Sequence, residues 1–347
     1  MAKGLFTQGM CVLLREPVSA ESVRERLSEF NWVRDHESES DDDAPLTMVY
    51  EYDPDSDGHL LVTPSTEPWP DDLGDPETTP ERFIAWSLGQ YGPLAFPGCL
   101  RRAGEQSWGW PDGPQKIDGH RCHIRLLVSY ILGNGDTEDG VADDSPLLPD
   151  DYNPLEELQF LTRAVESLLQ LPEAIGYFNP GGEVLRDGDG LRQGLNHAWN
   201  FEMPPLEMWT NVRLFQASGG WTLMDTVGNG QLDLPDVEAV YPADKFEPSD
   251  VERFLRSASL YLMQNEDEVA DGDTADGPGD QTWSAIECAD GLSDPPRETI
   301  RWVPADADDV PPELLDPGLE EDEQFDEDAL DADTPHDPDL DCDLEAE

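Results

Sequence analysis

A break in composition near residue 305 sets the limit on what this chain can fold into. From Ala305 to Glu347 the sequence holds 20 acidic residues and no Lys or Arg. Apolar residues are few there, and five prolines interrupt the segment. Such a segment cannot bury enough apolar surface to offset the entropy lost on ordering. We therefore predict a disordered acidic tail over residues 305–347 and a core built from the first 304 residues.

The part that precedes the tail is also strongly acidic. The whole chain has 78 Asp and Glu against 20 Lys and Arg, a net charge of -58, so the first 304 residues keep 58 acids against 20 bases, or -38. Nucleic-acid binding needs Lys and Arg to displace counterions, and no basic stripe exists. We predict no nucleic-acid partner and no membrane partner. Adaptation to a saline environment explains the acidity at least as well as a function does.

Cysteine usage and hydropathy indicate the compartment. The five cysteines are an odd number without a C-x-x-C pair, which is typical of reduced thiols. The first residues lack the long apolar run of a signal peptide, and no stretch is long enough to span a bilayer. We expect a soluble cytoplasmic protein.

Apolar periodicity predicts an α+β unit over residues 1–135. The predicted elements, in order, are a strand at 10–14, a helix from Ser19 to Phe30, strands at 46–52 and 59–63, a helix from Thr79 to Leu88, and a strand at 123–132. The order β-α-β-β-α-β is that of a ferredoxin-like split unit.

A second α+β unit is predicted over residues 152–304, with the boundary in 133–151. Its clearest element is a helix that begins at Asn153 and carries an apolar stripe through Leu158 and Leu168. The stretches 210–216 and 221–226 predict a hairpin, and Ser249 to Glu252 reads as a capping box. Strands at 174–178, 282–288 and 299–303 complete the unit.

Two motifs contain residue types that can bind a metal ion, but in both the sequence favours a structural role. Asp53, Asp55 and Asp57 with the following glycine match the first half of a calcium loop, but position 12 is Pro64 instead of Glu, so we predict a turn. The tetrapeptide from His120 to His123 places three potential metal ligands, two His and one Cys, in four residues. A fourth ligand group has no matching motif elsewhere, so we predict side chains that satisfy backbone groups. No metal is expected.

No signature of a cofactor or a nucleophile is present. The glycines of Gly188–Gly194 have the wrong spacing for a phosphate loop, so an N-cap at Asp187 is preferred. His197 has no nearby Ser or Cys, and hydrolase, zincin and Walker motifs are absent from the sequence. We predict no catalytic residue and no cofactor.

Residues 219–242, with the helix from Ser249 and the closing segment Pro296–Pro304, resemble the bacterial domain-of-unknown-function family number 4261. Residues 160–185 are similar to the part that precedes that domain. The resemblance implies a cytoplasmic bacterial protein of unassigned activity, with no agreed active site. Within it, Asp225, Asp236 and Glu238 surround a Gly-rich turn and form the candidate polar site, although the turn alone explains the glycines.

Three functions remain open at this point. The first is a non-catalytic binding or interaction protein, because no nucleophile, cofactor or metal pattern exists. The second is an acidic immunity- or decoy-type protein that neutralises a basic protein partner. The third is an enzyme with an unrecognised carboxylate site at the candidate polar residues. The oligomeric state is not predicted.

Overall fold

The computed structural model describes residues 3–36, 45–131, 148–265, 269–307 and 309–315. The chain divides into one compact unit that runs to Asp308 and another from Asp309 onward. In the second unit the described element is a short helix, α9 (Pro312–Leu315). From residue 316 onward the predicted disordered tail lies outside the described residues and stays a prediction, whereas residues 305–307 and 309–315 are described and include α9.

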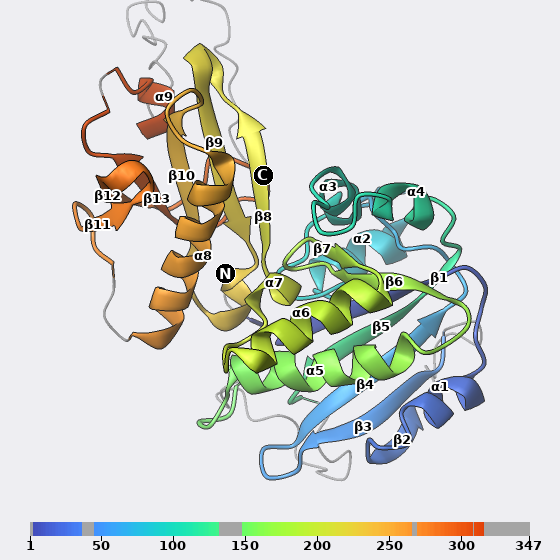
Figure 1. Ribbon diagram of the computed structural model, residues 1–347. Helices are drawn as coiled ribbons and strands as arrows, with labels where there is room; N and C mark the ends of the chain where they lie inside the picture. Colours follow the sequence, from blue (N-terminus) through green and yellow to red (C-terminus); the bar gives the residue numbers. More distant parts are fainter. Residues whose placement is uncertain (1–2, 37–44, 132–147, 266–268, 308, 316–347) are drawn as a thin grey trace, which may run out of the picture. The chain divides into compact units, whose positions relative to one another are not determined.

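The first unit contains two β-sheets, drawn in Figure 1. Sheet 1 has seven strands among the described residues, in the spatial order β2-β3-β4-β5-β1-β6-β7, and every neighbouring pair is antiparallel. The strands are β1 (Gln8–Leu14), β2 (Trp32–His36), β3 (Thr47–Asp53), β4 (Gly58–Ser65), β5 (Cys122–Ser129), β6 (Ala174–Asn179) and β7 (Val184–Arg186).

The α+β class is confirmed, but sheet 1 does not have the ferredoxin-like strand order. In a ferredoxin-like unit the first strand would lie between the third and the fourth predicted strands. Here β5, the fourth, lies between β4 and β1 and pairs with both along its whole length. The order of elements along the chain also differs from the predicted one, because the unpredicted strand β2 lies between the first helix and β3.

The predicted unit boundary between residues 135 and 152 is not where the two sheets divide. β6 and β7 follow that boundary in the chain and yet extend sheet 1 on the free side of β1. The sheets divide instead between the end of β7 at Arg186 and the start of β8 at Asn211.

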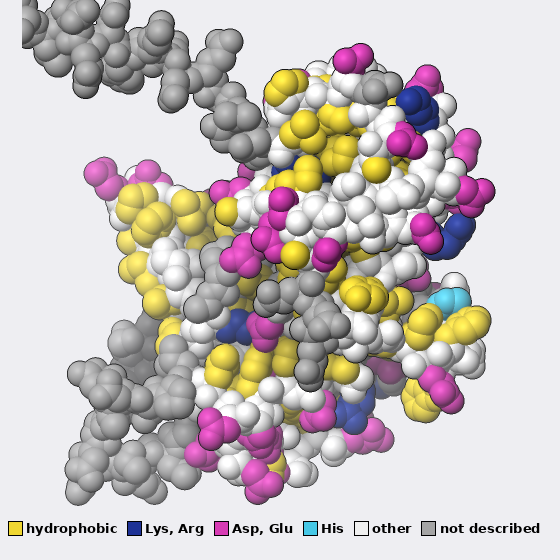
Figure 2. Space-filling model, turned by 90° about the vertical axis from the view of Figure 1, so that its left-hand side faces the viewer, with side chains coloured by type: hydrophobic (Ala, Val, Ile, Leu, Met, Phe, Trp, Pro, Cys, Tyr) yellow, Lys and Arg dark blue, Asp and Glu magenta, His cyan; other side chains and the backbone are white. Residues whose placement is uncertain are grey.

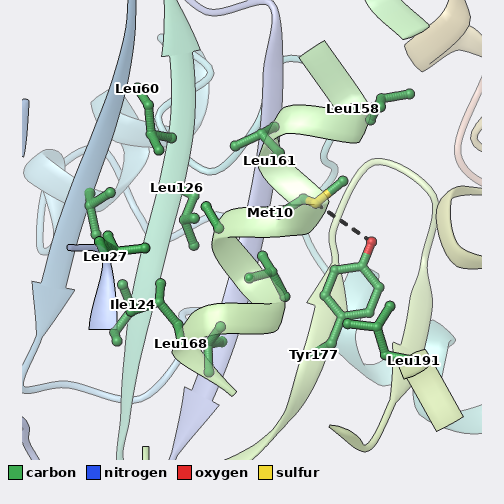
Figure 3. Packing of buried hydrophobic residues seen from close by; sticks show 14 of the residues in the cluster. Met10, Leu27, Leu60, Ile124, Leu126, Leu158, Leu161, Leu168, Tyr177 and Leu191 are labelled. Atoms are coloured by element: carbon green, nitrogen blue, oxygen red, sulfur yellow. Dashed lines mark hydrogen bonds between the residues drawn. The ribbon is translucent and has the colours of Figure 1, made fainter. Parts of the chain in front are cut away.

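Helices cover both faces of sheet 1. They are α1 (Ala20–Arg26), α2 (Pro80–Ser87), α3 (Cys99–Glu105), α4 (Gly113–Ile117), α5 (Pro154–Leu168), α6 (Gly188–Asn200) and α7 (Leu206–Trp209). α5 lies across one face, where Leu161 and Leu168 pack with Met10 and Ile124 (Figure 3). Tyr177 also lies there and contacts the Met10 sulfur at 3.7 Å.

The opposite face of sheet 1 carries a tryptophan-rich core. Successive residues of a strand point to opposite faces, so Cys11 and Leu13 of β1 turn away from α5. They join Trp69, Trp86 and Trp110, which lie with residues of α2, α3 and α4 in one buried cluster. Both faces of sheet 1 are therefore apolar and covered.

Sheet 2 has six strands among the described residues, in the order β11-β12-β13-β10-β9-β8. Its elements are β8 (Asn211–Gln216), η1 (Ser218–Gly220), β9 (Trp221–Val227), η2 (Asn229–Leu232), β10 (Asp236–Pro242), α8 (Pro248–Gln264), β11 (Thr274–Gly277), η3 (Pro278–Asp280), β12 (Gln281–Cys288) and β13 (Thr299–Pro304). The pair β10 and β13 is parallel, and the long crossover that such a pair needs contains α8.

α8 covers one face of sheet 2. Val251 and Leu255 of the helix pack on Val237 and Ala239 of β10 in a second hydrophobic core. The helix begins at Pro248, and no side chain caps it, so the predicted capping box at Ser249 is not observed. Proline is favoured at the first helical position because its missing N–H would have no partner there.

Within the described ranges, each helix is too short or too polar to cross a lipid bilayer.

Candidate functional site

A row of charged side chains crosses sheet 2. Arg213 of β8 lies opposite Asp225 of β9. Asp225 in turn lies opposite Glu238 of β10, which is the register partner of Arg301 of β13. Residues paired in this way share a face of the sheet. The row therefore has the charge order plus, minus, minus, plus, and each of its members is at most 1% exposed.

Asp225 is the centre of this arrangement. Arg213 donates to both carboxylate oxygens, from Nε at 3.0 Å and from Nη2 at 2.7 Å. Arg297 donates from Nη2 to Oδ2 at 2.6 Å, and the Ser293 hydroxyl donates to the same oxygen. The carboxylate thus accepts from two guanidinium groups and one hydroxyl, and no lone pair is left facing solvent.

The row is tied to sheet 1 through Glu183. This residue lies in the turn between β6 and β7, where its backbone has a φ of 50°. Its Oε2 accepts from Nη1 of Arg213 at 3.0 Å, and its Oε1 accepts from Nε of Arg102 at 2.6 Å. Because Arg102 belongs to α3 and Arg213 to β8, one buried carboxylate joins the two sheets.

Asp236 begins β10 and holds the loop before it. Its Oδ1 accepts from the Thr226 hydroxyl at 2.7 Å and from the backbone N–H of Asn229 at 3.1 Å. Its Oδ2 accepts from the backbone N–H of Gly228 at 3.3 Å and lies 3.2 Å from Nε of Arg297. Gly228 has a φ of 127°, a conformation that other residues rarely adopt.

Glu238 and Arg301 form the far end of the row. Arg301 donates from Nε to Glu238 Oε1 at 2.6 Å, and the backbone N–H of Leu292 donates to Oε2 at 3.1 Å. The three carboxylates predicted as a polar site are thus brought together, but they lie inside the protein rather than at a rim.

Burial and the arginines act in opposite directions on these groups. Burial alone would raise the pKa of the Asp225 carboxyl, but Arg213 and Arg297 outweigh it and hold that pKa below its usual value. At Asp236 and Glu238, burial outweighs the neighbouring arginines, and the pKa of each carboxyl is raised. Of these three carboxyl groups, Asp225 is the one whose ionised form the arginines favour over burial.

The network is balanced in charge. Its four carboxylates are matched by four guanidinium groups, those of Arg102, Arg213, Arg297 and Arg301. Paired and buried charges of this kind fix the relative placement of strands, and removing one partner leaves a buried charge that costs several kcal/mol. The arrangement has the chemistry of a structural core rather than of a proton-transfer centre.

A cavity of about 600 Å³ opens beside one end of the network. Asp236 and Arg297 form part of its wall, together with the exposed acids Asp233, Asp290 and Glu298. Apolar side chains complete the lining: Leu94, Phe96, Val227, Leu234, Pro235 and Pro296. We call this space the Arg297 cavity.

The tetrapeptide at His120 does not assemble a metal site. The ring of His120 donates from Nδ1 to a backbone carbonyl at 2.6 Å and accepts at Nε2 from the backbone N–H of Trp69 at 3.0 Å. His123 donates to the Glu67 carbonyl at 2.9 Å, and burial lowers its pKa to about 4. Cys122 packs on the α5 side of the sheet, away from His123. In the part of the chain that is described, no group of three or more His, Cys, Asp or Glu side chains has an arrangement that could hold a metal ion.

In the Asp53 motif and the Gly188–Gly194 motif, aspartate side chains also accept hydrogen bonds from backbone N–H groups. Asp53 and Gly58 close the hairpin between β3 and β4, and Asp53 Oδ1 accepts from the Asp55 N–H at 3.1 Å. Asp187 is the N-cap of α6 and accepts from the backbone N–H of Gly190 at 2.7 Å. The predicted turn and the predicted N-cap are both observed.

The family of part of the chain can now be stated. Residues 225–303 match the family DUF4261, described as a domain of unknown function. The resemblance is confirmed for this segment, which runs from Asp225 in β9 to Val303 in β13. The DUF4261 segment contains all three predicted carboxylates with Arg297 and Arg301, whereas Arg213 precedes it. No curated protein and no solved structure was found to match the chain.

The arginines of the network were missed at the level of sequence, although a signal for them exists. Basic residues are rare here, and Arg213 and Arg301 each stand between apolar residues in a strand. In a strand such an arginine points to the face opposite its apolar neighbours, and if that face is also covered the buried arginine needs a carboxylate partner. A pair between a buried arginine and a carboxylate could therefore be expected from the sequence, but which carboxylate each arginine contacts could not.

Proposed function

We propose that this protein is a non-catalytic binding protein of the bacterial cytoplasm and that its partner is a basic segment of another protein. The observation that supports the proposal is the lining of the Arg297 cavity. A volume of about 600 Å³ is in the range of ligand-binding pockets, and the walls combine apolar surface with carboxylates.

The charge balance inside this cavity favours a cationic occupant. Arg297 is the one basic residue in the lining, and it is already engaged by Asp225 and Asp236. Asp233 is paired with Lys3 at 3.0 Å, but Asp290 and Glu298 have no ion pair among the described residues. A Lys or Arg side chain of a partner would supply the missing positive charge.

The geometry of the candidate carboxylates favours binding over catalysis. Asp225 and Glu238 are fully buried, so neither can touch a ligand in the cavity. Asp236 lines the cavity, but both of its oxygens already accept hydrogen bonds from the protein. A carboxylate used in acid–base chemistry needs an oxygen within reach of the substrate.

The cytoplasmic location is part of the proposal. Cys11, Cys99 and Cys122 are buried thiols, a state that a reducing compartment preserves. Figure 2 shows one side of the molecule, on which Asp and Glu side chains are far more frequent than Lys and Arg. Such a field would speed the approach of a basic protein, so an immunity- or decoy-type role is the second form that this function could take.

The test uses a fluorescein-labelled peptide of alternating Leu and Arg residues, with binding measured by fluorescence anisotropy at low and high salt. The double variant Asp290→Lys/Glu298→Lys should weaken binding by about tenfold or more, because each reversal replaces an attraction by a repulsion. The matched control Glu25→Lys/Glu77→Lys changes the net charge equally at exposed positions on other elements. Equal weakening in both double variants, or no binding by the native protein, would refute the proposal.

A further inference from the structure

A second cavity lies between α8 and the strands β11 and β13. It has a volume of about 500 Å³ and contains side chains of three aromatic residues, Phe254, Tyr261 and Trp302. Two acids, Asp273 and Asp276, also line it. We call this space the aromatic cavity.

The fold places the three rings together. Phe254 and Tyr261 are seven residues apart on α8 and therefore lie on one face of the helix. Trp302 comes from β13, and its ring centroid is 5.4 Å from that of Phe254, with an angle of 76° between the planes. Trp302 is buried, whereas Tyr261 is 49% exposed and forms the outer part of the wall.

The aromatic cavity has negative charge and no positive charge. Its lining includes no Lys or Arg among the described residues. Asp273 and Asp276 are both exposed, and the Asp273 carboxylate accepts one hydrogen bond, from the backbone N–H of Ala270 at 2.9 Å. Apart from Ser257 and Thr274, the remaining lining residues are apolar: Val237, Ala258, Leu262, Val269, Ala275 and Ile300.

The choice of tryptophan at residue 302 is informative. Its indole N–H is buried and has no hydrogen-bond acceptor among the described groups. A phenylalanine would fill a core position without leaving a donor unpaired, which is unfavourable in a buried site. Indole is, however, the side chain whose face attracts cations most strongly. Trp302 belongs to the second hydrophobic core, and because it also lines the aromatic cavity its indole can form a cation-binding wall there.

The aromatic cavity neighbours a further space that also adjoins the Arg297 cavity. It shares Leu262 and Ile300 with a space of about 680 Å³. That space shares Leu234, Pro235 and Glu298 with the Arg297 cavity. An extended chain segment could follow this path, which is lined by apolar side chains and acids.

We propose that the aromatic cavity binds the alkylammonium head of a lysine side chain, methylated or unmethylated, in the partner segment. The proposal rests on the function proposed above and names the side chain that the partner supplies. The ammonium group would lie against the faces of Tyr261 and Trp302, and its aliphatic stem would lie along the apolar wall. Asp276 would balance the charge.

The test uses choline as a small alkylammonium probe and 3,3-dimethylbutan-1-ol as its uncharged isostere. Binding is followed by NMR through the indole N–H resonance of Trp302, assigned with a Trp302→Phe variant. We expect choline to shift this resonance and the isostere to bind several-fold more weakly. Tyr261→Ala and Asp276→Asn should each weaken choline binding by roughly threefold to tenfold, whereas Tyr261→Phe keeps the ring and the affinity.

Controls separate this inference from the function on which it rests. Trp199→Ala removes an exposed ring on α6 and should leave choline binding unchanged. Equal binding of choline and its isostere, or unchanged binding in Tyr261→Ala, would overturn the inference even if the Leu-Arg peptide binds. Binding of choline at Trp302 together with no binding of that peptide would support the aromatic site and refute the proposed function alone.

Discussion

Removal of Arg301 should strongly destabilise the protein, because its partner cannot reach water. Arg301 and Glu238 are both fully buried, and Nε of the arginine lies 2.6 Å from Oε1 of the glutamate. In Arg301→Met the apolar stem is retained and the charge is lost. The Glu238 carboxylate then stays inside sheet 2 with one backbone donor, the N–H of Leu292 at 3.1 Å.

The expected loss is about 3–5 kcal/mol of unfolding free energy, the usual cost of breaking one half of a buried pair. The double variant Glu238→Leu/Arg301→Met removes both charges. Its remaining cost is the unpaired N–H of Leu292, about 1–3 kcal/mol. The double variant should therefore be more stable than Arg301→Met alone, although it carries one more substitution.

Urea unfolding of the native protein, both single variants and the double variant gives the coupling free energy directly. Arg253→Met, which breaks an exposed pair on α8, is the control and should change stability by less than about 1 kcal/mol. If the effects of Glu238→Leu and Arg301→Met simply add, the two side chains do not compensate each other, and the interpretation of the row as a charge-balanced core is refuted.

Two further predictions concern a close backbone approach and a buried acid. A Cβ on Gly182 would lie 1.7 Å from the Trp209 carbonyl oxygen, so Gly182→Ala should lose at least about 1–3 kcal/mol in urea unfolding. Gly4→Ala, with no atom within 4 Å of its Cβ, should change little, and equal stability of the two variants would contradict the structure. Glu157 of α5 is fully buried, and burial raises its pKa even though the Thr7 hydroxyl donates to it at 2.6 Å. Because the folded state then binds this proton more tightly than the unfolded state, its contribution to stability is complete below the unfolded pKa and is lost as pH rises through the folded pKa. Glu157→Gln should therefore gain stability relative to the native protein as pH rises above about 4.3, and a difference that does not change with pH would refute this.

Elements with a regular apolar period could be predicted from the sequence. The helix from Asn153, the hairpin of β8 and β9, and strands β12 and β13 lie close to where the pattern places them. In each of these elements the apolar residues face a single core, so the apolar period in the sequence matches the element that is observed. Strand pairing could not be predicted, because β5 is buried on both faces and its sequence does not specify which strands lie beside it.

The central strand β10 was missed because of the same residues that form the candidate site. Its sequence begins Asp236-Val237-Glu238, and acidic side chains are depleted in strands. Only the presence of Arg297 and Arg301 makes these carboxylates tolerable in the interior. The arginines that allow this strand to be buried therefore lie some sixty residues away in the sequence, and a prediction from local patterns cannot detect them.

The paired charges in the interior also determine which acidic residues can contribute to the net negative charge of the chain. In the buried network that joins the two sheets, four carboxylates meet four arginines, so this network contributes nothing to the net charge of -58. Among the described residues outside this network, Asp290, Glu298 and Asp276 are acids that face outward and line the cavities. A carboxylate at the surface repels other anions and attracts cations over about 10 Å at moderate salt. The acids that could act on a ligand are consequently these outward ones, and the chemistry they offer is the attraction of positive charge.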